Sequence, residues 1–241
     1  YSVTGGAPPL SYQWRKDGED IPGATGATLA VNSVTMGAAG SYRCRVADSL
    51  DNTLLSQPAV LEVADPPAIV QQPVDARVYA GEAHSFSLVM SDGFAPYSYQ
   101  WRKDGLDIPG ATDSVYTLPA PTSDDIGGYS CLVHDALGTE RVSRMALLDV
   151  ALPLSIAVHP TPGRAYTGGS HVFRITVEGG FAPLQYAWSK DETPLTDGTQ
   201  RTYTIDAIRP VDAGAYASTV TDDLGSTVAS QAAALEVAPA L

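Results

Sequence analysis

The chain is short of cysteine, basic residues and long apolar runs, and each shortage removes one line of interpretation. Two cysteines in 241 residues give no disulfide framework that would indicate an oxidising compartment. No stretch approaches the roughly 20 apolar residues that a membrane-spanning helix needs. Fourteen basic residues against 27 acidic ones give a net charge of −13, which disfavours binding to nucleic acid or to anionic membranes. We expect no nucleic-acid partner and no membrane insertion by this segment.

The sequence also lacks the usual spacings of catalytic and metal-binding residues. His84 and His171 lie 87 positions apart, and His134 and His159 are isolated, so no His-x-x-x-His or Cys-x-x-Cys pair occurs. There is no glycine-rich phosphate loop and no Gly-x-Ser-x-Gly elbow. We therefore predict a protein that is not an enzyme, with no metal site and no cofactor.

A repeat of 87 residues is present throughout the chain. Tyr-Gln-Trp-Arg-Lys-Asp-Gly occupies 12–18 and again 99–105, and Tyr-Ala-Trp-Ser-Lys-Asp-Glu occupies 186–192. One structural unit is therefore used three times. The repeated aromatic residues are Trp14, Trp101, Trp188, Tyr42, Tyr129 and Tyr216. A residue present in every copy most economically serves the fold, so a specific site should appear as a departure from the repeat.

The repeat predicts three domains, at residues 1–64, 65–151 and 152–241, which we call copies one, two and three. Copy two has about 23 residues before the position that matches Tyr1. We therefore expect copy one to lack its opening strand and part of the next. The junctions are short and rich in proline, which is typical of semi-rigid spacers.

Alternation of apolar and polar residues predicts strands throughout. In copy two, Phe86, Leu88 and Met90 alternate with polar or smaller residues, and Tyr129, Cys131 and Val133 do the same. Turn-forming pairs such as Asp104-Gly105 separate these runs. Many short strands at this spacing indicate an all-β chain of antiparallel sandwiches.

The motifs resemble immunoglobulin-like domains of the intermediate type. The resemblance rests on Gly-Phe-Ala-Pro before the Trp and on Asp125, Gly127, Tyr129 and Cys131 in copy two. It implies three consecutive Greek-key β-sandwiches, the first truncated at its N-terminus. The amino-acid sequence of the repeated motif is most similar to that of tandem modules in large secreted or surface-attached bacterial proteins. The resemblance is specific for the fold and says little about function.

The resemblance assigns structural roles to the repeated residues. The tryptophans would fill the space between two sheets, and the tyrosines would form a corner whose hydroxyl bonds back to the chain. The family usually joins strands B and F by a disulfide, but strand F carries Cys44, Cys131 and Ser218, while the matching strand-B positions hold Tyr1, Leu88 and Ile175. We expect Leu88, Ile175, Cys44 and Cys131 to lie in the core, with free thiols at the two cysteines; a reactive or intermolecular thiol is the alternative.

The acidic residues could in principle bind calcium between the domains. Asp48, Asp135 and Asp222 are equivalent and lie in a predicted turn between the last two long strands, where Asp usually bonds its own backbone. The junctions supply too few of the six to eight oxygens that calcium requires. We expect turn formation and no calcium site.

Two functions of different class remain open. The first is a non-catalytic spacer in a larger extracellular or cell-surface protein, whose partners are other domains of the same polypeptide. The second is an adhesion module that binds protein or glycan through its loops; Tyr97 is the best candidate contact. The spacer is favoured because the loops contain no aromatic cluster of the kind that forms binding hot spots. An intracellular titin-like spring is a third possibility, and the extracellular assignment rests on resemblance.

Overall fold

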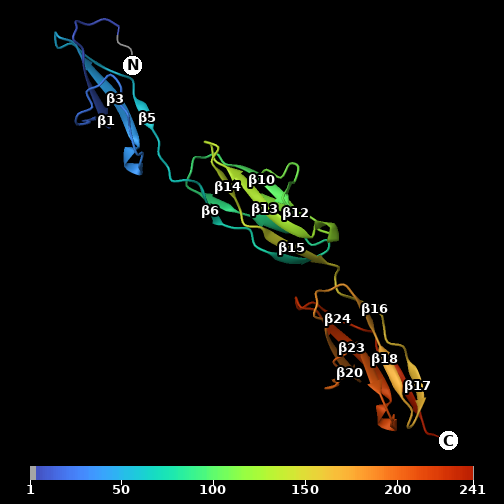
Figure 1. The fold of residues 1–241 in the computed structure, drawn as a ribbon. Helices are drawn as coiled ribbons and strands as arrows, with labels where there is room; N and C mark the ends of the chain where they lie inside the picture. Colours follow the sequence, from blue (N-terminus) through green and yellow to red (C-terminus); the bar gives the residue numbers. More distant parts are fainter. Residues whose placement is uncertain (1–3, 241) are drawn as a thin grey trace. The chain divides into compact units, whose positions relative to one another are not determined.

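The computed structural model describes residues 4–240, and their regular secondary structure is almost entirely β-strand, with three short 3-10 helices among the described residues (Figure 1). Contacts between Cα atoms divide the chain into two compact units. One holds residues up to 70 with 89–98 and 133–141, and the other holds 71–88, 99–132 and residues from 142 onward. The division passes through copy two, so the domain boundaries at 64 and 151 remain predictions.

Copy one contains a single sheet in its described residues. The strand order is β2-β1-β3-β4, with β5 also paired to β3. One short 3-10 helix, Met36–Ala38, precedes β3. The strands are β1 (Ser11–Lys16), β2 (Glu19–Asp20), β3 (Gly40–Ala47), β4 (Thr53–Leu55) and β5 (Ala59–Leu61). Tyr1 lies outside the described residues.

Copy two adds strands that form a second layer. Its larger sheet has the order β11-β10-β13-β15-β7, with β14 paired to β13, and the shorter pairs β12-β8 and β6-β9 complete it. A 3-10 helix, Ser123–Asp125, precedes β13. The strands are β6 (Ala68–Gln71), β7 (Ala76–Tyr79), β8 (His84–Ser87), β9 (Val89–Ser91), β10 (Ser98–Lys103), β11 (Leu106–Asp107), β12 (Val115–Leu118), β13 (Gly127–His134), β14 (Glu140–Val142) and β15 (Ala146–Ala151).

Copy three repeats this arrangement. Its larger sheet is β17-β25-β23-β20-β21 with β24 on β23, and the pairs β18-β22 and β16-β19 form the other layer. The 3-10 helix is Pro210–Asp212. The strands are β16 (Ser155–Val158), β17 (Gly163–Tyr166), β18 (His171–Arg174), β19 (Thr176–Glu178), β20 (Gln185–Lys190), β21 (Thr193–Pro194), β22 (Thr202–Ile205), β23 (Gly214–Thr221), β24 (Thr227–Ala229) and β25 (Ala233–Ala238). The prediction of an all-β chain of sandwiches is confirmed for the fold class.

Local sequence explains the strands and their turns. Along β13, buried Tyr129, Cys131 and Val133 alternate with less buried residues, as a half-buried sheet requires. Between β10 and β11, Asp104 and Gly105 have φ values of 50° and 83°. Two successive positive φ values produce the tight hairpin that Asp-Gly favours. The core of copy three gathers Phe173, Ile175, Trp188, Tyr216 and their neighbours from both layers.

Candidate functional site

Polar side chains of the repeated motif form hydrogen bonds with the backbone of their own copy. The amides of Gln13 and Gln100 each donate to two carbonyl oxygens, at 2.8–2.9 Å. The aspartate at the sixth position of the motif accepts a backbone N–H at 2.8 Å in every copy, and these residues are Asp17, Asp104 and Asp191. These groups are therefore used by the fold.

The three tryptophans differ in burial. Trp101 and Trp188 are 0% and 1% exposed, whereas Trp14 is partly exposed. Each indole N–H donates to a backbone carbonyl twelve residues later, at 2.8–3.0 Å. The expectation that Trp14 fills the space between two sheets is not met, because only one sheet is described in copy one.

The three repeated tyrosines bond back to the chain. The hydroxyls of Tyr42, Tyr129 and Tyr216 donate to the carbonyl four residues upstream, at 2.7–2.8 Å. Burial raises the pKa of Tyr129 and of Tyr216 to about 12, with nearby aspartates adding to the effect. Both hydroxyls stay protonated at neutral pH and act as hydrogen-bond donors within the fold.

Sequence reasoning missed an aromatic cluster in copies two and three. In copy two, the rings of Phe86 and Tyr129 stack at 4.7 Å, and Tyr116 lies 6.0 Å from Tyr129 and 6.3 Å from Trp101. The same four-ring cluster recurs in copy three as Phe173, Trp188, Tyr203 and Tyr216. The signal was available in the sequence, since both added rings repeat at 87 residues.

The cysteines lie in the interior as free thiols. Cys44 and Cys131 are 1% and 0% exposed. Burial raises the pKa of Cys131 to about 11, so its thiol is protonated and unreactive at neutral pH. The positions across from the strand-F residues, Leu88 and Ile175, are 3% and 2% exposed. In copy three the buried hydroxyl of Ser218 has no hydrogen-bond partner among the residues described.

The equivalent aspartates Asp48, Asp135 and Asp222 each close the turn after their long strand. In each, one carboxylate oxygen accepts two backbone N–H groups of the turn, at 2.8–3.1 Å. Hydrogen bonds lower the pKa of Asp48 to about 2, and the bond donated by the Ala7 backbone N–H has the largest effect. Between residues 4 and 240, no group of three or more His, Cys, Asp or Glu side chains is arranged to hold a metal ion.

Tyr97, the candidate ligand contact, is partly buried in the loop between β9 and β10. Its hydroxyl donates to the carbonyl of Asp92 within the same loop. This hydrogen bond joins the two ends of the loop, so the Tyr97 hydroxyl is used within the loop. Its position in copy three is occupied by Leu184, which packs against the core.

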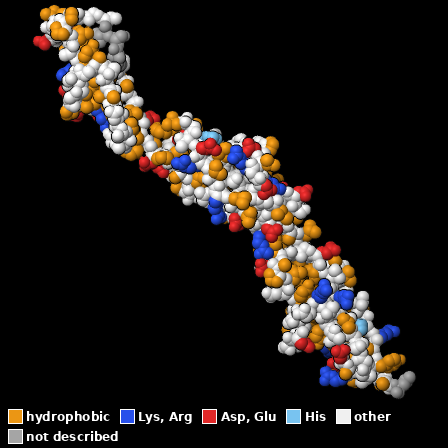
Figure 2. All heavy atoms as spheres, viewed as in Figure 1, with side chains coloured by type: hydrophobic (Ala, Val, Ile, Leu, Met, Phe, Trp, Pro, Cys, Tyr) orange, Lys and Arg blue, Asp and Glu red, His pale blue; other side chains and the backbone are white. Residues whose placement is uncertain are grey.

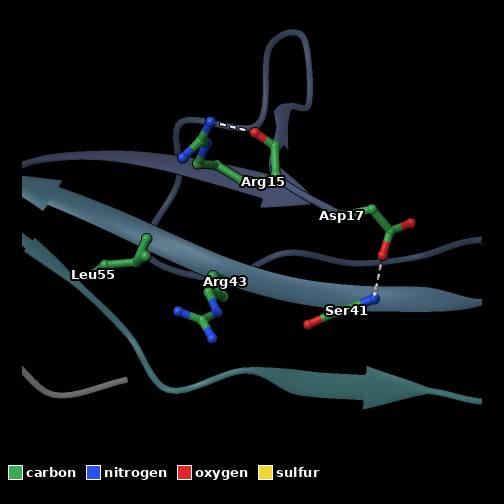
Figure 3. Close-up of a pocket in the computed structure, with 6 residues that line it drawn as sticks. Arg15, Asp17, Ser41, Arg43 and Leu55 are labelled. Carbon is green, nitrogen blue, oxygen red and sulfur yellow. Dashed lines mark hydrogen bonds between the residues drawn. The ribbon is translucent and has the colours of Figure 1, made fainter.

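The first sheet contains a hollow of about 320 Å³ lined by Arg15, Asp17, Arg43, Leu55 and two neighbours (Figure 3). Arg15 and Arg43 are direct cross-strand partners, an arrangement of like charges that disfavours pairing. Arg15 is neutralised by Asp20 at 2.8 Å, and Asp17 accepts the Ser41 N–H at 2.8 Å. An anion entering the hollow would meet the Asp17 carboxylate, so the arrangement does not make a phosphate or carboxylate site.

Charge is mixed over the visible surface. On the face drawn in Figure 2, Lys and Arg side chains lie among Asp and Glu and do not gather into a patch. The three lysines occupy one repeat position, at Lys16, Lys103 and Lys190. No helix within the described range has the length and apolarity to cross a bilayer.

A further cluster, missed by sequence reasoning, links copies two and three within one compact unit. Arg77 and Tyr79 of β7 contact Phe181, Asp222 and Asp223. Arg77 forms an ion pair with Asp223 at 2.6 Å and lies 4.4 Å from the centre of the Phe181 ring. The Tyr79 hydroxyl donates to Asp222 at 2.6 Å, and its ring is 5.5 Å from that of Phe181. An ion pair, a cation–π contact, a hydrogen bond and a ring contact therefore meet in this one group of side chains.

Comparison with known proteins gives the following matches. No family model matches the chain. Among curated proteins it is 27% identical over 227 residues to the cell adhesion molecule DSCAML1 of Gallus gallus, covering 84% of this chain and 11% of that protein. It is 28% identical over 254 residues to protein sax-3 of Caenorhabditis elegans, covering 94% and 20%. The chain thus spans between a tenth and a fifth of the length of these relatives.

Solved structures decide the fold. An I-band fragment of titin superposes with a TM-score of 0.65 at 22% identity, covering 95% of this chain and 88% of that one. Extracellular domains 3–5 of Drosophila OTK superpose with a TM-score of 0.57 at 21% identity, covering 96% and 86%. The chain therefore has the fold of tandem immunoglobulin-like domains. The expected similarity to bacterial modules is wrong for the curated relatives, which are animal proteins.

Proposed function

We propose that this segment is a non-catalytic spacer of immunoglobulin-like domains within a larger extracellular or cell-surface protein. The observation that carries the proposal is that the repeated polar side chains bond to the backbone of their own copy. Side chains used in this way are not free to recognise a ligand. The partners would then be the adjoining domains of the same polypeptide.

The cell-surface location is supported by the animal relatives. One of them is a cell adhesion molecule by name, and the match covers most of this chain. This similarity also favours the second function, adhesion through a loop. The similarity to titin supports the fold alone.

A two-residue exchange separates the functions. The loop of copy two, residues 92–97, differs from residues 179–184 of copy three only at Asp92 and Tyr97, where copy three has Gly179 and Leu184. The double variant D92G/Y97L therefore gives copy two a loop that already folds in this chain. Leu184→Tyr in copy three is the matched control, because a side chain at Gly179 would overlap the backbone oxygens of Leu152 and Pro153 at 2.3–2.5 Å.

Beads coated with the wild-type chain or with either variant are presented to cultured animal cells, and the retained fraction is counted after a fixed shear. The spacer function predicts that wild-type beads are retained no more than beads coated with albumin, and that neither variant changes retention. Retention by the wild type that is lost in D92G/Y97L would establish adhesion through this loop instead. Retention that survives both exchanges would contradict the spacer and place adhesion elsewhere.

A further inference from the structure

The contact between copies two and three has two halves, each on a different copy. We call Arg77 with Tyr79 the Arg-Tyr pair, and Phe181 with Asp222 and Asp223 the acceptor. The pair belongs to β7, which runs parallel to β15 with Asp149 opposite Arg77 and Ala151 opposite Tyr79. The acceptor lies on the two loop segments that precede β20 and follow β23.

The acceptor is held in place before it meets the pair. One oxygen of Asp222 accepts the turn N–H groups of Leu224 and Ser226, and the other accepts the Phe181 N–H at 3.0 Å. Burial alone would raise the pKa of Asp222, but these bonds and the Tyr79 hydroxyl lower it. The carboxylate is charged and oriented, which strengthens a hydrogen bond from a phenol.

The Arg-Tyr pair occurs a second time, at Arg164 and Tyr166 of β17. The register is the same, because β17 runs parallel to β25 with Glu236 opposite Arg164 and Ala238 opposite Tyr166. Here the pair is open. Tyr166 is 62% exposed, and the Arg164 side chain is 84% exposed, compared with 36% for Arg77. Arg164 forms an ion pair with Glu236 on the neighbouring strand at 2.7 Å.

A hollow of about 300 Å³ lies at this second pair. It is lined by Arg164, Ala165, Tyr166 and the facing residues of β25. An exposed ion pair such as Arg164 with Glu236 contributes little to stability, so the arginine can exchange its partner at small cost. The surface therefore presents a cation, a phenol and an apolar floor in the same strand register as the occupied pair.

We propose that Arg164 and Tyr166 form a docking site for a further immunoglobulin-like module joined in tandem after β25. The expected module carries a phenylalanine in the loop before its tryptophan strand and an Asp-Asp pair in the turn after its tyrosine strand. The complete acceptor is not a general feature of the repeat. Copy three has all three residues, whereas copy two has Phe94 and Asp135 but Ala136, and copy one has Ala7, Asp48 and Ser49.

The test adds a second copy three, which carries the acceptor, to the end of the full chain. Residues 152–241 are joined again after Ala238, which reproduces the junction between Ala151 and Leu152. The added copy carries Tyr166→Phe, so the original Tyr166 gives a unique peptide. Hydroxyl-radical labelling followed by mass spectrometry measures the exposure of Tyr166, and Tyr79 in the same chain is the reference for a docked tyrosine.

Docking predicts that labelling of Tyr166 falls in the extended chain to the rate measured at Tyr79. Asp223→Ala together with Phe181→Ala, both in the added copy only, should restore the rate of the unextended chain. Asp223→Ala alone, again in the added copy, should restore the labelling rate in part. This variant is conservative because copy two already carries alanine at the equivalent position, Ala136.

Three results would overturn the proposal. Equal labelling of Tyr166 with and without the added copy would show that nothing docks. Protection that persists in the double variant would show shielding by the linker and no recognition. Protection of Tyr166 in the unextended chain that grows with protein concentration would assign the surface to a second copy of the whole chain. None of these results bears on whether the segment is a spacer or an adhesion module.

Discussion

Copies one and three share a tryptophan and a tyrosine but differ in what lies behind them. In copy three, Trp188 is 1% exposed within a core built from two layers. In copy one, Trp14 is partly exposed, and the described residues form one sheet. Both indoles nevertheless donate the same backbone bond. The repeated motif is therefore sufficient for the hairpin and its hydrogen bonds, and burial of the ring requires the second layer.

The largest expected difference is between Trp188→Ala and Trp14→Ala. Removing a fully buried tryptophan should cost copy three about 3–5 kcal/mol of unfolding free energy. Trp14 loses less buried area, so its removal should cost roughly 1 kcal/mol, less than the 1.5–3 kcal/mol of a fully buried apolar side chain. Differential scanning calorimetry of the full chain measures both.

Two calorimetric results would break this comparison. Equal costs for the two variants would show that Trp14 is as well packed as Trp188. A wild-type scan in which copy one unfolds together with copies two and three would show that its single sheet is no weaker than a sandwich, whereas we expect copy one to unfold first.

A smaller effect is expected at Ser218. Its buried hydroxyl lacks a partner among the described residues, while the equivalent Cys131 is buried without such a loss. Ser218→Cys should stabilise copy three by about 1–2 kcal/mol, the cost of an unsatisfied buried polar group. Cys131→Ser is the reciprocal variant and should destabilise copy two by a similar amount. Chemical denaturation under reducing conditions measures both, and a destabilised Ser218→Cys would refute the explanation.

The smallest effect is a dependence of copy two on pH. Burial lowers the pKa of His84 below its ordinary value of 6.5. The unfolded state therefore binds the proton first, so stability is complete above about pH 6.5 and declines as the pH falls toward the lower folded value. The unfolding midpoint of copy two should decrease over this window, and His84→Gln should remove the decrease.

His134→Gln is the matched control for the pH measurement. It changes a different histidine of the same copy, in β13, and shows whether the loss of any histidine alters the measured slope. A wild-type slope that survives in His84→Gln would show that another group titrates. Asp135 does not interfere, since its turn hydrogen bonds outweigh burial and lower its pKa from an ordinary value of 3.8.

Much of the fold could be predicted from the sequence because its signals are local. Period-two alternation at Tyr129, Cys131 and Val133 identified a half-buried strand, and Asp104-Gly105 identified a hairpin. The motif also suggested a similarity to bacterial modules, which the animal relatives do not support. The Gln, Trp and Asp side chains of Tyr-Gln-Trp-Arg-Lys-Asp-Gly bond to the backbone of their own copy, so the motif reports the fold and says little about lineage.

The cluster around Arg77 could not be predicted in the same way. Arg77 and Asp223 are 146 positions apart, and each resembles an ordinary surface charge when read locally. Only the recurrence of Arg-x-Tyr at 77–79 and 164–166 indicated that these side chains have a shared role. Detecting that role requires knowing which loops lie at the end of β7.

The parallel pairing of β7 with β15, and of β17 with β25, has a mechanical consequence. In each case a strand near the start of a copy lies beside the strand that ends it. Tension applied through both ends of the copy pulls the two strands past one another along their length. Their hydrogen bonds then share the load and must rupture together, which is the arrangement that resists stretching best in a chain under strain.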